Sequence, residues 1–371
     1  LKLLSKKVYN LHMFVGYAPL SFILSVALCA LLIFLDRKAA IAGDVNVRET
    51  AQTLHKKSIS RFGGVAIYLS AIITTYIFGF NLANSAAFLI MLFCLPAFLV
   101  GFLDDLKFNI DPKLRILLLL PVPILFFYFG GIQVTDLHLG YFDDFLEVEI
   151  LALFFLCFAV IGMMNAFNLI DGINGQLSSY LLSIIIALKV VEHLSGTSVE
   201  LTNEYRYFTN ILLGSLLGFF ILNLFGKIFL GDAGAYFLGA IVCYAIIDAQ
   251  QDNDFSPWAV MLMLAYPFTD LIFSVVRRKF ITGGDAMQPD AEHLHHVIYK
   301  RFKKLNFRHD RARHLLTIIF LTTFNFPYIA SAVYFADNTP ALVSIFVVYI
   351  LSYLLIYFSL SPRFLISNDK K

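Results

Sequence analysis

The chain has 371 residues, of which 59% are apolar and 15% are charged. A soluble domain is usually about a quarter charged, so this composition excludes a soluble globular protein. Lys and Arg number 28 and Asp and Glu 26, which gives a net charge of +2. Such a balance lacks the basic field typical of nucleic-acid binding, and we expect no nucleic-acid partner. The four cysteines are widely spaced within apolar runs, which indicates buried thiols rather than a disulfide framework.

Eleven mostly apolar runs follow one another along the chain, and each is long enough for a helix to cross a bilayer. The runs are continuous rather than alternating, which excludes a β-barrel. We therefore predict an all-α, polytopic membrane bundle that forms one domain over residues 1–371. The expected spans are 12–35, 63–83, 85–103, 112–131, 149–170, 176–194, 207–226, 233–249, 257–276, 314–334 and 340–360.

Basic residues gather in alternate connections between these spans. If the N-terminus lies outside, the inner segments hold 23 of the 28 Lys and Arg residues. Cytoplasmic loops carry this kind of excess, so we predict an outside N-terminus and a cytoplasmic C-terminus. The inner connections before the C-terminal tail are 36–62, 104–115, 171–175, 227–232 and 277–313.

The inner connections also carry nearly every unusual polar residue. They contain or adjoin the motifs GFLDDLK (101–107), NAFNLIDGING (165–175), FLGDAG (229–234), PFTD (267–270) and HLHH (293–296). Random placement would scatter these groups over both membrane faces. We therefore predict one site assembled from separate elements at the cytoplasmic ends of the spans.

The adjacent pair Asp104 and Asp105 closes the third span. Neighbouring residues point about 100° apart on a helix, so both can face one ion only where the helix ends. Mg²⁺ typically uses one or two carboxylates together with substrate phosphates. The alternative is a solvated helix terminus, although an acidic residue there opposes the helix dipole.

Polar residues spaced by three close the fifth span, namely Asn165, Asn168 and Asp171, and Asn174 follows in a glycine-rich turn. This spacing places the first three on one helical stripe. Amides and a carboxylate beside bare backbone suit a pocket for a base and a ribose. Hydrogen bonding between helices is the alternative.

Two further aspartates allow two interpretations each. Asp232, between Gly231 and Gly234, is either a helix N-cap or a metal ligand whose glycines let a diphosphate approach. Asp270 lies within the ninth span, seven residues before Arg277. A membrane-embedded carboxylate is a functional candidate, but it can also orient its helix through an internal hydrogen bond.

A histidine cluster, His293, His295 and His296, opens a segment in which apolar residues recur with a helical period and lysines and arginines lie between them. This pattern predicts a basic amphipathic helix at the inner interface. Binding of anionic lipid is the alternative role. A zinc site is disfavoured because no cysteine or second histidine pair accompanies the cluster.

In this order and on these connections, the motifs resemble those of the polyprenyl-phosphate N-acetylhexosamine-1-phosphate transferases, glycosyltransferase family 4. The resemblance extends from Lys56 to the segment after His296. The HLHH motif and eleven spans are more similar to the undecaprenyl-phosphate N-acetylglucosamine-1-phosphate transferases. The related phospho-N-acetylmuramoyl-pentapeptide transferases have an unbroken histidine triplet, which is absent here.

The resemblance implies that undecaprenyl phosphate reacts with a UDP-N-acetylhexosamine to give a lipid-diphospho-sugar and UMP. The reaction would be the first membrane step of a cell-envelope polysaccharide, such as a cell-wall polymer or an O-antigen. It implies a bacterial inner membrane, contact with membrane lipids, and Mg²⁺, or Mn²⁺ in its place. A homodimer is a further expectation.

The resemblance also implies roles for individual residues. Catalytic roles fall to Asp104, Asp105, Asp232, His293, His295 and His296, with Asp232 and Asp105 as metal ligands. Substrate contacts are implied for Lys57, Lys113, Asn165, Asn168, Asp171, Asn174, Phe229, Asp270, Arg277 and Arg278, with Phe229 stacking on uracil. Lys57, Lys113 and Arg278 would offset the charge of the phosphates.

Departures from the family pattern leave the sugar open. Asn174 stands where many relatives have Asp, and Ala291 where relatives often carry Arg. The second change removes a fixed phosphate-binding fork. Two alternatives stay open: an activity like that of the phospho-N-acetylmuramoyl-pentapeptide transferases, and a transporter. A CDP-alcohol phosphotransferase is disfavoured, because its single run of spaced Asp, Gly and Arg on adjoining helices is absent. A transporter would bind its substrate near the midplane.

Overall fold

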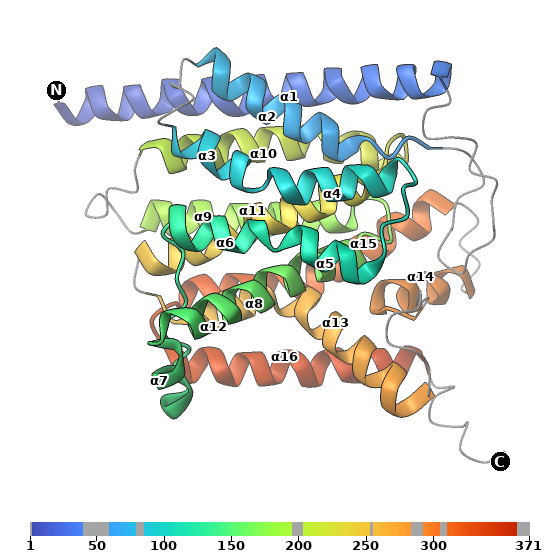
Figure 1. Cartoon of the computed structure of the whole chain (residues 1–371). Helices are drawn as coiled ribbons and strands as arrows, with labels where there is room; N and C mark the ends of the chain where they lie inside the picture. Colours follow the sequence, from blue (N-terminus) through green and yellow to red (C-terminus); the bar gives the residue numbers. More distant parts are fainter. Residues whose placement is uncertain are drawn as a thin grey trace.

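The computed structural model describes residues 2–39, 59–78, 85–194, 203–252, 255–282, 292–304 and 310–361. Within these ranges the regular structure is helical throughout, and each of the eleven expected apolar runs contains helix. The helices lie side by side as a bundle (Figure 1). The prediction of an all-α, polytopic membrane protein is confirmed.

The elements are α1 (Lys2–Ala39), α2 (Gly63–Ile77), α3 (Ala86–Phe93), α4 (Leu95–Asp105), α5 (Pro112–Leu119), α6 (Pro121–Phe129), η1 (Gly140–Phe142), α7 (Asp143–Leu146), α8 (Glu149–Ile170), α9 (Gln176–Leu194), α10 (Asn203–Leu224), α11 (Gly231–Asp252), α12 (Pro257–Met263), α13 (Ala265–Val276), η2 (Arg277–Thr282), α14 (Leu294–Lys304), α15 (Asp310–Tyr334) and α16 (Thr339–Leu360). Figure 1 shows the α4–α5 connection and α14 toward the same end of the bundle.

By length and composition, seven segments among the described residues can each cross a membrane, and two bent helix pairs raise the number to nine. The two other expected spans are α2, a shorter apolar helix of 15 residues, and α9, which has 19. The number eleven and the sides on which the termini lie stay predictions.

Two expected spans are broken, which corrects the prediction of continuous runs at 85–103 and 257–276. Helices α3 and α4 meet at 44°, and α12 and α13 meet at 73°. Pro267 in α13 has no N–H to give to the carbonyl of Met263, one turn earlier. That carbonyl accepts the hydroxyl of Tyr180 instead, at 2.7 Å, so the break leaves no buried acceptor unpaired there.

Helix α11 runs through the middle of the bundle (Figure 1), and 16 of its 22 residues are buried. Its first turns have close neighbours on two sides. A Cβ on Gly64 of α2 would overlap the backbone of Gly234, and a Cβ on Gly101 of α4 would overlap the backbone of Asp232 and Ala233. Glycine therefore lets α2 and α4 approach the FLGDAG motif closely.

We predict that Gly64→Ala destabilises the protein, because the added methyl overlaps backbone that cannot rotate away. Overpacking of this kind costs about 1–3 kcal/mol, which should appear as a lower unfolding temperature in detergent. Gly162→Ala is the matched control, since a Cβ at Gly162 of α8 meets nothing within 4 Å. Equal unfolding temperatures for the two variants would contradict the proposed contact.

Candidate functional site

The last residue of α4 holds the first turn of α11. The Asp105 carboxylate accepts the backbone N–H groups of Asp232 and Ala233, each at 3.0 Å, and the residue is 3% exposed. These N–H groups have no partner within their own helix, and they lie at its positive end. Asp105 thus fills the capping role that the sequence allowed for Asp232. The Asp232 carboxylate is left available for other contacts.

Gly231 makes this arrangement possible. Its φ of +77° lies in the left-handed region, which glycine adopts without steric cost. A Cβ there would overlap the carbonyl oxygen of Arg61 and the Asp105 carboxylate. The backbone between α10 and α11 therefore contacts both the α4 terminus and the segment that precedes α2.

Asp104 belongs to a second set of contacts. Its Oδ2 lies 2.6 Å from Nη2 of Arg115, and its Oδ1 accepts the N–H of Ile110 at 2.9 Å. Arg115 also donates to the hydroxyl of Tyr236 at 3.2 Å, and Asn168 donates to the same hydroxyl at 3.1 Å. Residues of α4, α5, α8 and α11 are thereby joined beside the acidic cluster.

Asp171 caps the C-terminal end of α8, and it interacts electrostatically with Asp232 and Asp105. Burial raises the pKa of Asp171 well above its usual range, and these two carboxylates raise it further. The exposed Arg61 opposes this effect. We call Asp105, Asp171 and Asp232 the acidic cluster. The direction of the shift means that the cluster favours an additional positive charge.

The turn after α8 is tied to the α10–α11 connection through Asn223. Its Oδ1 accepts the N–H of Gly175 at 2.6 Å, and its Nδ2 donates to the carbonyl of Ile228 at 2.8 Å. Phe229 then pairs through its backbone with residues 60 and 63. The side chain of Asn174 lies against Gly226, so both segments predicted to face the nucleotide are neighbours.

Asn165 donates its side-chain hydrogen bond within α8 and not to the other site residues. Its side-chain nitrogen bonds to the carbonyl of Ile161 in the same helix, at 2.8 Å. Lys113 is exposed at the start of α5, and Arg115, two residues later, makes the contacts to Asp104 and Tyr236. Lys57 and Ala291 lie outside the described residues.

Asp270 anchors the histidine segment. It accepts Nδ1 of His293 at 2.7 Å, the N–H of Leu294 at 3.1 Å and the hydroxyl of Tyr353 at 2.7 Å. With 1% of its surface exposed, Asp270 contacts the protein itself. These contacts support the internal hydrogen bond that the sequence left as an alternative, and the substrate contact of Asp270 stays a prediction.

The side chains of the two arginines after α13 also bond to other groups of the chain. Arg277 is 2% exposed and pairs with Glu292 at 2.8 Å, and Arg278 donates to the carbonyl of Ser274 at 3.3 Å. Arg277 thus reinforces the attachment of the histidine segment to α13. The predicted helix after the histidines is confirmed as α14, with Lys303 and Lys304 exposed.

His295 and His296 connect α14 with the turn after α8. Their ring centroids are 4.1 Å apart, and a Cβ on Gly172 would overlap Nε2 of His295 and lie 3.2 Å from Cε1 of His296. Burial, followed by the charges of His296 and His293, lowers the pKa of His295 well below its usual range. A neutral imidazole therefore lies beside the residue that follows Asp171.

The carboxylate oxygens of the acidic cluster are the kind of ligand that Mg²⁺ prefers. Among the described residues, no three His, Cys, Asp or Glu side chains are placed to surround one ion. Mg²⁺ needs only one or two carboxylates where phosphates supply the other ligands. Asp232 and Asp171 fit that requirement. Both oxygens of Asp105 already accept backbone N–H groups, so its metal role stays a prediction.

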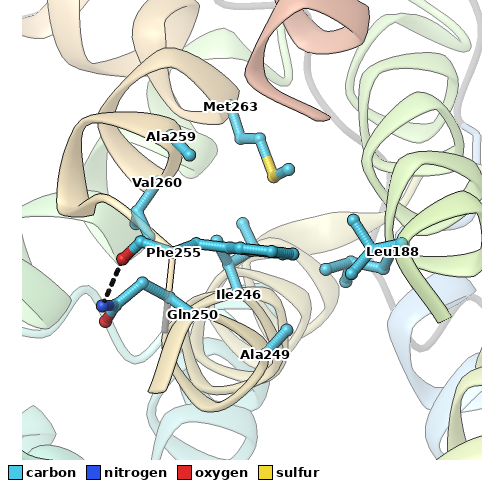
Figure 2. A pocket seen from close by; sticks show the side chains of 9 residues that line it. Leu188, Ile246, Ala249, Gln250, Phe255, Ala259, Val260 and Met263 are labelled. Atoms are coloured by element: carbon cyan, nitrogen blue, oxygen red, sulfur yellow. Dashed lines mark hydrogen bonds between the residues drawn. The ribbon is translucent and has the colours of Figure 1, made fainter. Parts of the chain in front are cut away.

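An apolar pocket lies at the opposite end of α11 (Figure 2) and is not part of this site. It is about 14 to 18 residues from Asp232 along the helix, or roughly 20 Å or more. About 230 Å³ of space lies between its lining residues, and part of that space is open to solvent. The lining residues are Leu188, Val191, Ile246, Ala249, Gln250, Phe255, Ala259, Val260 and Met263.

Comparisons with known proteins agree with this geometry. The sequence model of glycosyl transferase family 4 matches residues 87–250, a segment that contains the whole acidic cluster. Over this segment the chain is similar to that family.

Two groups of curated relatives are similar to this chain. The undecaprenyl-phosphate alpha-N-acetylglucosaminyl 1-phosphate transferase of Escherichia coli K12 is 26% identical over 73% of each chain. Its counterpart in Thermotoga maritima is 29% identical over 69% of this chain and 74% of the relative. The phospho-N-acetylmuramoyl-pentapeptide-transferase of Streptococcus sanguinis is 29% identical over 71% of this chain and 81% of the relative.

Several contributors to the site were missed from the sequence. Arg61 and Arg115 lie in inner connections and could have been found among the basic residues there. Tyr236 and Asn223 lie within apolar helices, where a tyrosine or an asparagine more often indicates packing or interhelical bonding. Only the three-dimensional contacts distinguish them.

We predict that Asp105→Asn loosens the start of α11. Each Asp105 oxygen accepts one N–H, and an asparagine would present an NH₂ group to one of these donors. Leaving a buried N–H unpaired costs about 1–3 kcal/mol, so amides 232 and 233 should lose protection from hydrogen exchange. Asp111→Asn is the control, because Asp111 caps α5 by accepting the N–H groups of Lys113 and Leu114, and asparagine caps a helix as well as aspartate does. Unchanged protection in Asp105→Asn would contradict the capping role.

Proposed function

We propose that the chain transfers a sugar-1-phosphate, in the first instance N-acetylglucosamine-1-phosphate, from a UDP-sugar to undecaprenyl phosphate. The chain is an enzyme of the phosphotransferase type. The relatives named for undecaprenyl phosphate support the acceptor, and the members of both groups support the reaction class. The carrying observation is that the acidic cluster, Arg115 and the histidines of α14 come together at one end of the bundle.

In the proposed reaction, an oxygen of the lipid phosphate forms a bond to the β-phosphorus of the UDP-sugar. The bond from that phosphorus to the bridging oxygen breaks, and UMP leaves with the electron pair. The acceptor phosphate has a second pKa near 6 and is mostly ionised at pH 7. No general base is therefore required, and Asp104, paired with Arg115 at 2.6 Å, orients that guanidinium.

Electrostatics decide how such a site works, because both substrates are anions that repel each other. Arg61 and Arg115 supply fixed positive charge at the cluster, and transition-state charge is stabilised by such preorganised groups. Asp232 and Asp171 would hold Mg²⁺, or Mn²⁺ in its place, and the ion when bound would neutralise phosphate charge. The neutral His295 and its neighbour His296 would face the diphosphate.

The nucleotide end would lie along the turn after α8. Asn168 and Asn174 offer amides, and Phe229 offers a half-buried ring for the uracil. The tie from Asn223 to Gly175 holds this turn in place. Lys57 keeps its predicted role as a nucleotide contact. All of these residues belong to one chain, so the proposed site requires no second copy, whether or not a homodimer forms.

The direct test is an assay of UMP release with undecaprenyl phosphate, Mg²⁺ and a panel of UDP-sugars that includes the muramoyl-pentapeptide donor. We expect UMP with at least one N-acetylhexosamine donor, and loss of activity by more than about a hundredfold in Asp232→Asn. Asp248→Asn is the control, since it makes the same change about 24 Å farther along α11. Near-normal turnover in Asp232→Asn would refute the metal role.

The proposed location is a bacterial inner membrane with the site on the cytoplasmic face. Tyr141 is 89% exposed beyond α6, and Lys303 is exposed on α14. A cysteine in place of Lys303 should react with an impermeant thiol reagent only from the cytoplasm, and one in place of Tyr141 only from outside. The native cysteines are buried or half-buried, so they give a low background. Labelling with the opposite sidedness would reverse the topology.

A further inference from the structure

Three buried polar side chains form a line that the proposed reaction has not yet used. They are Gln176 at the start of α9, Tyr266 in α13 and His295 in α14, with 2%, 1% and 0% of their surfaces exposed. Nε2 of Gln176 lies 2.8 Å from the hydroxyl of Tyr266. That hydroxyl lies 3.5 Å from Nδ1 of His295. The line ends beside Gly172 in the turn after α8.

The amide of Gln176 determines which way the hydrogen bonds run. Its NH₂ group carries two donors, and its oxygen is an acceptor. With Nε2 toward Tyr266, one donor is paired and the oxygen has no partner among the described residues. The reverse orientation would leave both donors unpaired, which is more costly than the one donor and one carbonyl that stay unpaired in this orientation. The Tyr266 hydroxyl therefore accepts from Gln176.

The hydroxyl proton of Tyr266 then needs an acceptor of its own. Within the described part of the chain, the other side-chain polar atom in reach is Nδ1 of His295. The separation of 3.5 Å is at the long end for a hydrogen bond, as is common for such contacts before substrate binds. Nδ1 of His295 is thus the accepting nitrogen of the ring.

A neutral imidazole has one N–H and one bare nitrogen. His295 is buried among the other two histidines of its cluster and is held neutral by that burial. If Nδ1 accepts from Tyr266, the ring proton is on Nε2. This nitrogen has no hydrogen-bond partner among the described residues, and it lies against Gly172, next to Asp171.

We propose that Gln176 and Tyr266 are positioning residues that hold His295 in its Nε2–H tautomer, so that the ring offers a donor to an anionic phosphate oxygen of the substrate. A bare nitrogen at this place would present a lone pair to that oxygen and repel it. The identity of the ligand rests on the proposed function, whereas the tautomer does not. This positioning role differs from simple packing, because it depends on the hydroxyl of Tyr266 and the amide of Gln176 and not on the volume of either side chain.

The tautomer can be observed by ¹⁵N NMR of protein labelled at histidine, because protonated and bare ring nitrogens have different shifts. The signal of His295 is assigned from its absence in His295→Asn. We expect protonated Nε2 in the native protein and a mixture of tautomers in Tyr266→Phe. Tyr349→Phe is the matched control, because Tyr349 is fully buried and donates to Asn325 at 3.0 Å without contacting the histidines. It should leave the His295 signal unchanged.

The kinetic arm uses the UMP-release assay. Tyr266→Phe should lower kcat/KM about tenfold, the value of one hydrogen bond to a charged group, and Tyr349→Phe should change it less than about twofold. Gln176→Leu should act like Tyr266→Phe, and the double variant should lose no more than either single variant, because all act through one imidazole. If Tyr266→Phe does not fold, Gln176→Leu provides the same test.

The results distinguish the positioning role of Gln176 and Tyr266 from the proposed transferase function. Protonated Nδ1 in the native protein, or an unchanged tautomer in both Tyr266→Phe and Gln176→Leu, would overturn the positioning role. Absence of UMP release from the native protein, combined with protonated Nε2 that is lost in Tyr266→Phe, would refute the proposed function and leave the positioning role intact.

Discussion

The capping of α11 by a carboxylate from another helix is the interaction on which the site depends. Asp105 brings a negative charge to the helix end where Asp232 also lies, and two such charges repel. The backbone N–H groups of Asp232 and Ala233 offset this repulsion, because they lie at the positive end of the helix dipole and bond to the Asp105 oxygens. The Asp232 side chain then interacts with Asn168 and, electrostatically, with the third carboxylate, Asp171. The capping interaction therefore fixes α4, α11 and the geometry of the cluster together.

Much of this arrangement could be predicted from the sequence. Long apolar runs dictate helices in a bilayer, and the ends of those helices are where polar groups can gather. The motifs around Asp105, Asp171 and Asp232 were therefore expected to converge, and the structure brings them together. Confinement to one membrane face reduces the number of arrangements that such motifs can adopt, which is why separated motifs sufficed.

The separate role of each of these residues could not be predicted, because it depends on contacts between distant segments. Adjacent Asp104 and Asp105 look equivalent in the sequence, yet one pairs with Arg115 and the other caps α11. Asp270 resembles a functional embedded carboxylate until its three internal donors are known. In each case the role depends on which group donates hydrogen bonds to the carboxylate oxygens. The local sequence pattern does not show which group that is.

The break in the ninth expected span explains how a local sequence feature sets contacts between distant segments. Even a straight helix through 257–276 would lack the backbone bond from Pro267 to Met263, and the hydroxyl of Tyr180 donates to the Met263 carbonyl in its place. The bend of 73° sends α13 across the bundle (Figure 1) toward α14. That path carries Asp270 to His293 and Tyr266 to His295. A proline in the membrane-spanning region thereby determines where the histidines lie relative to the acidic cluster.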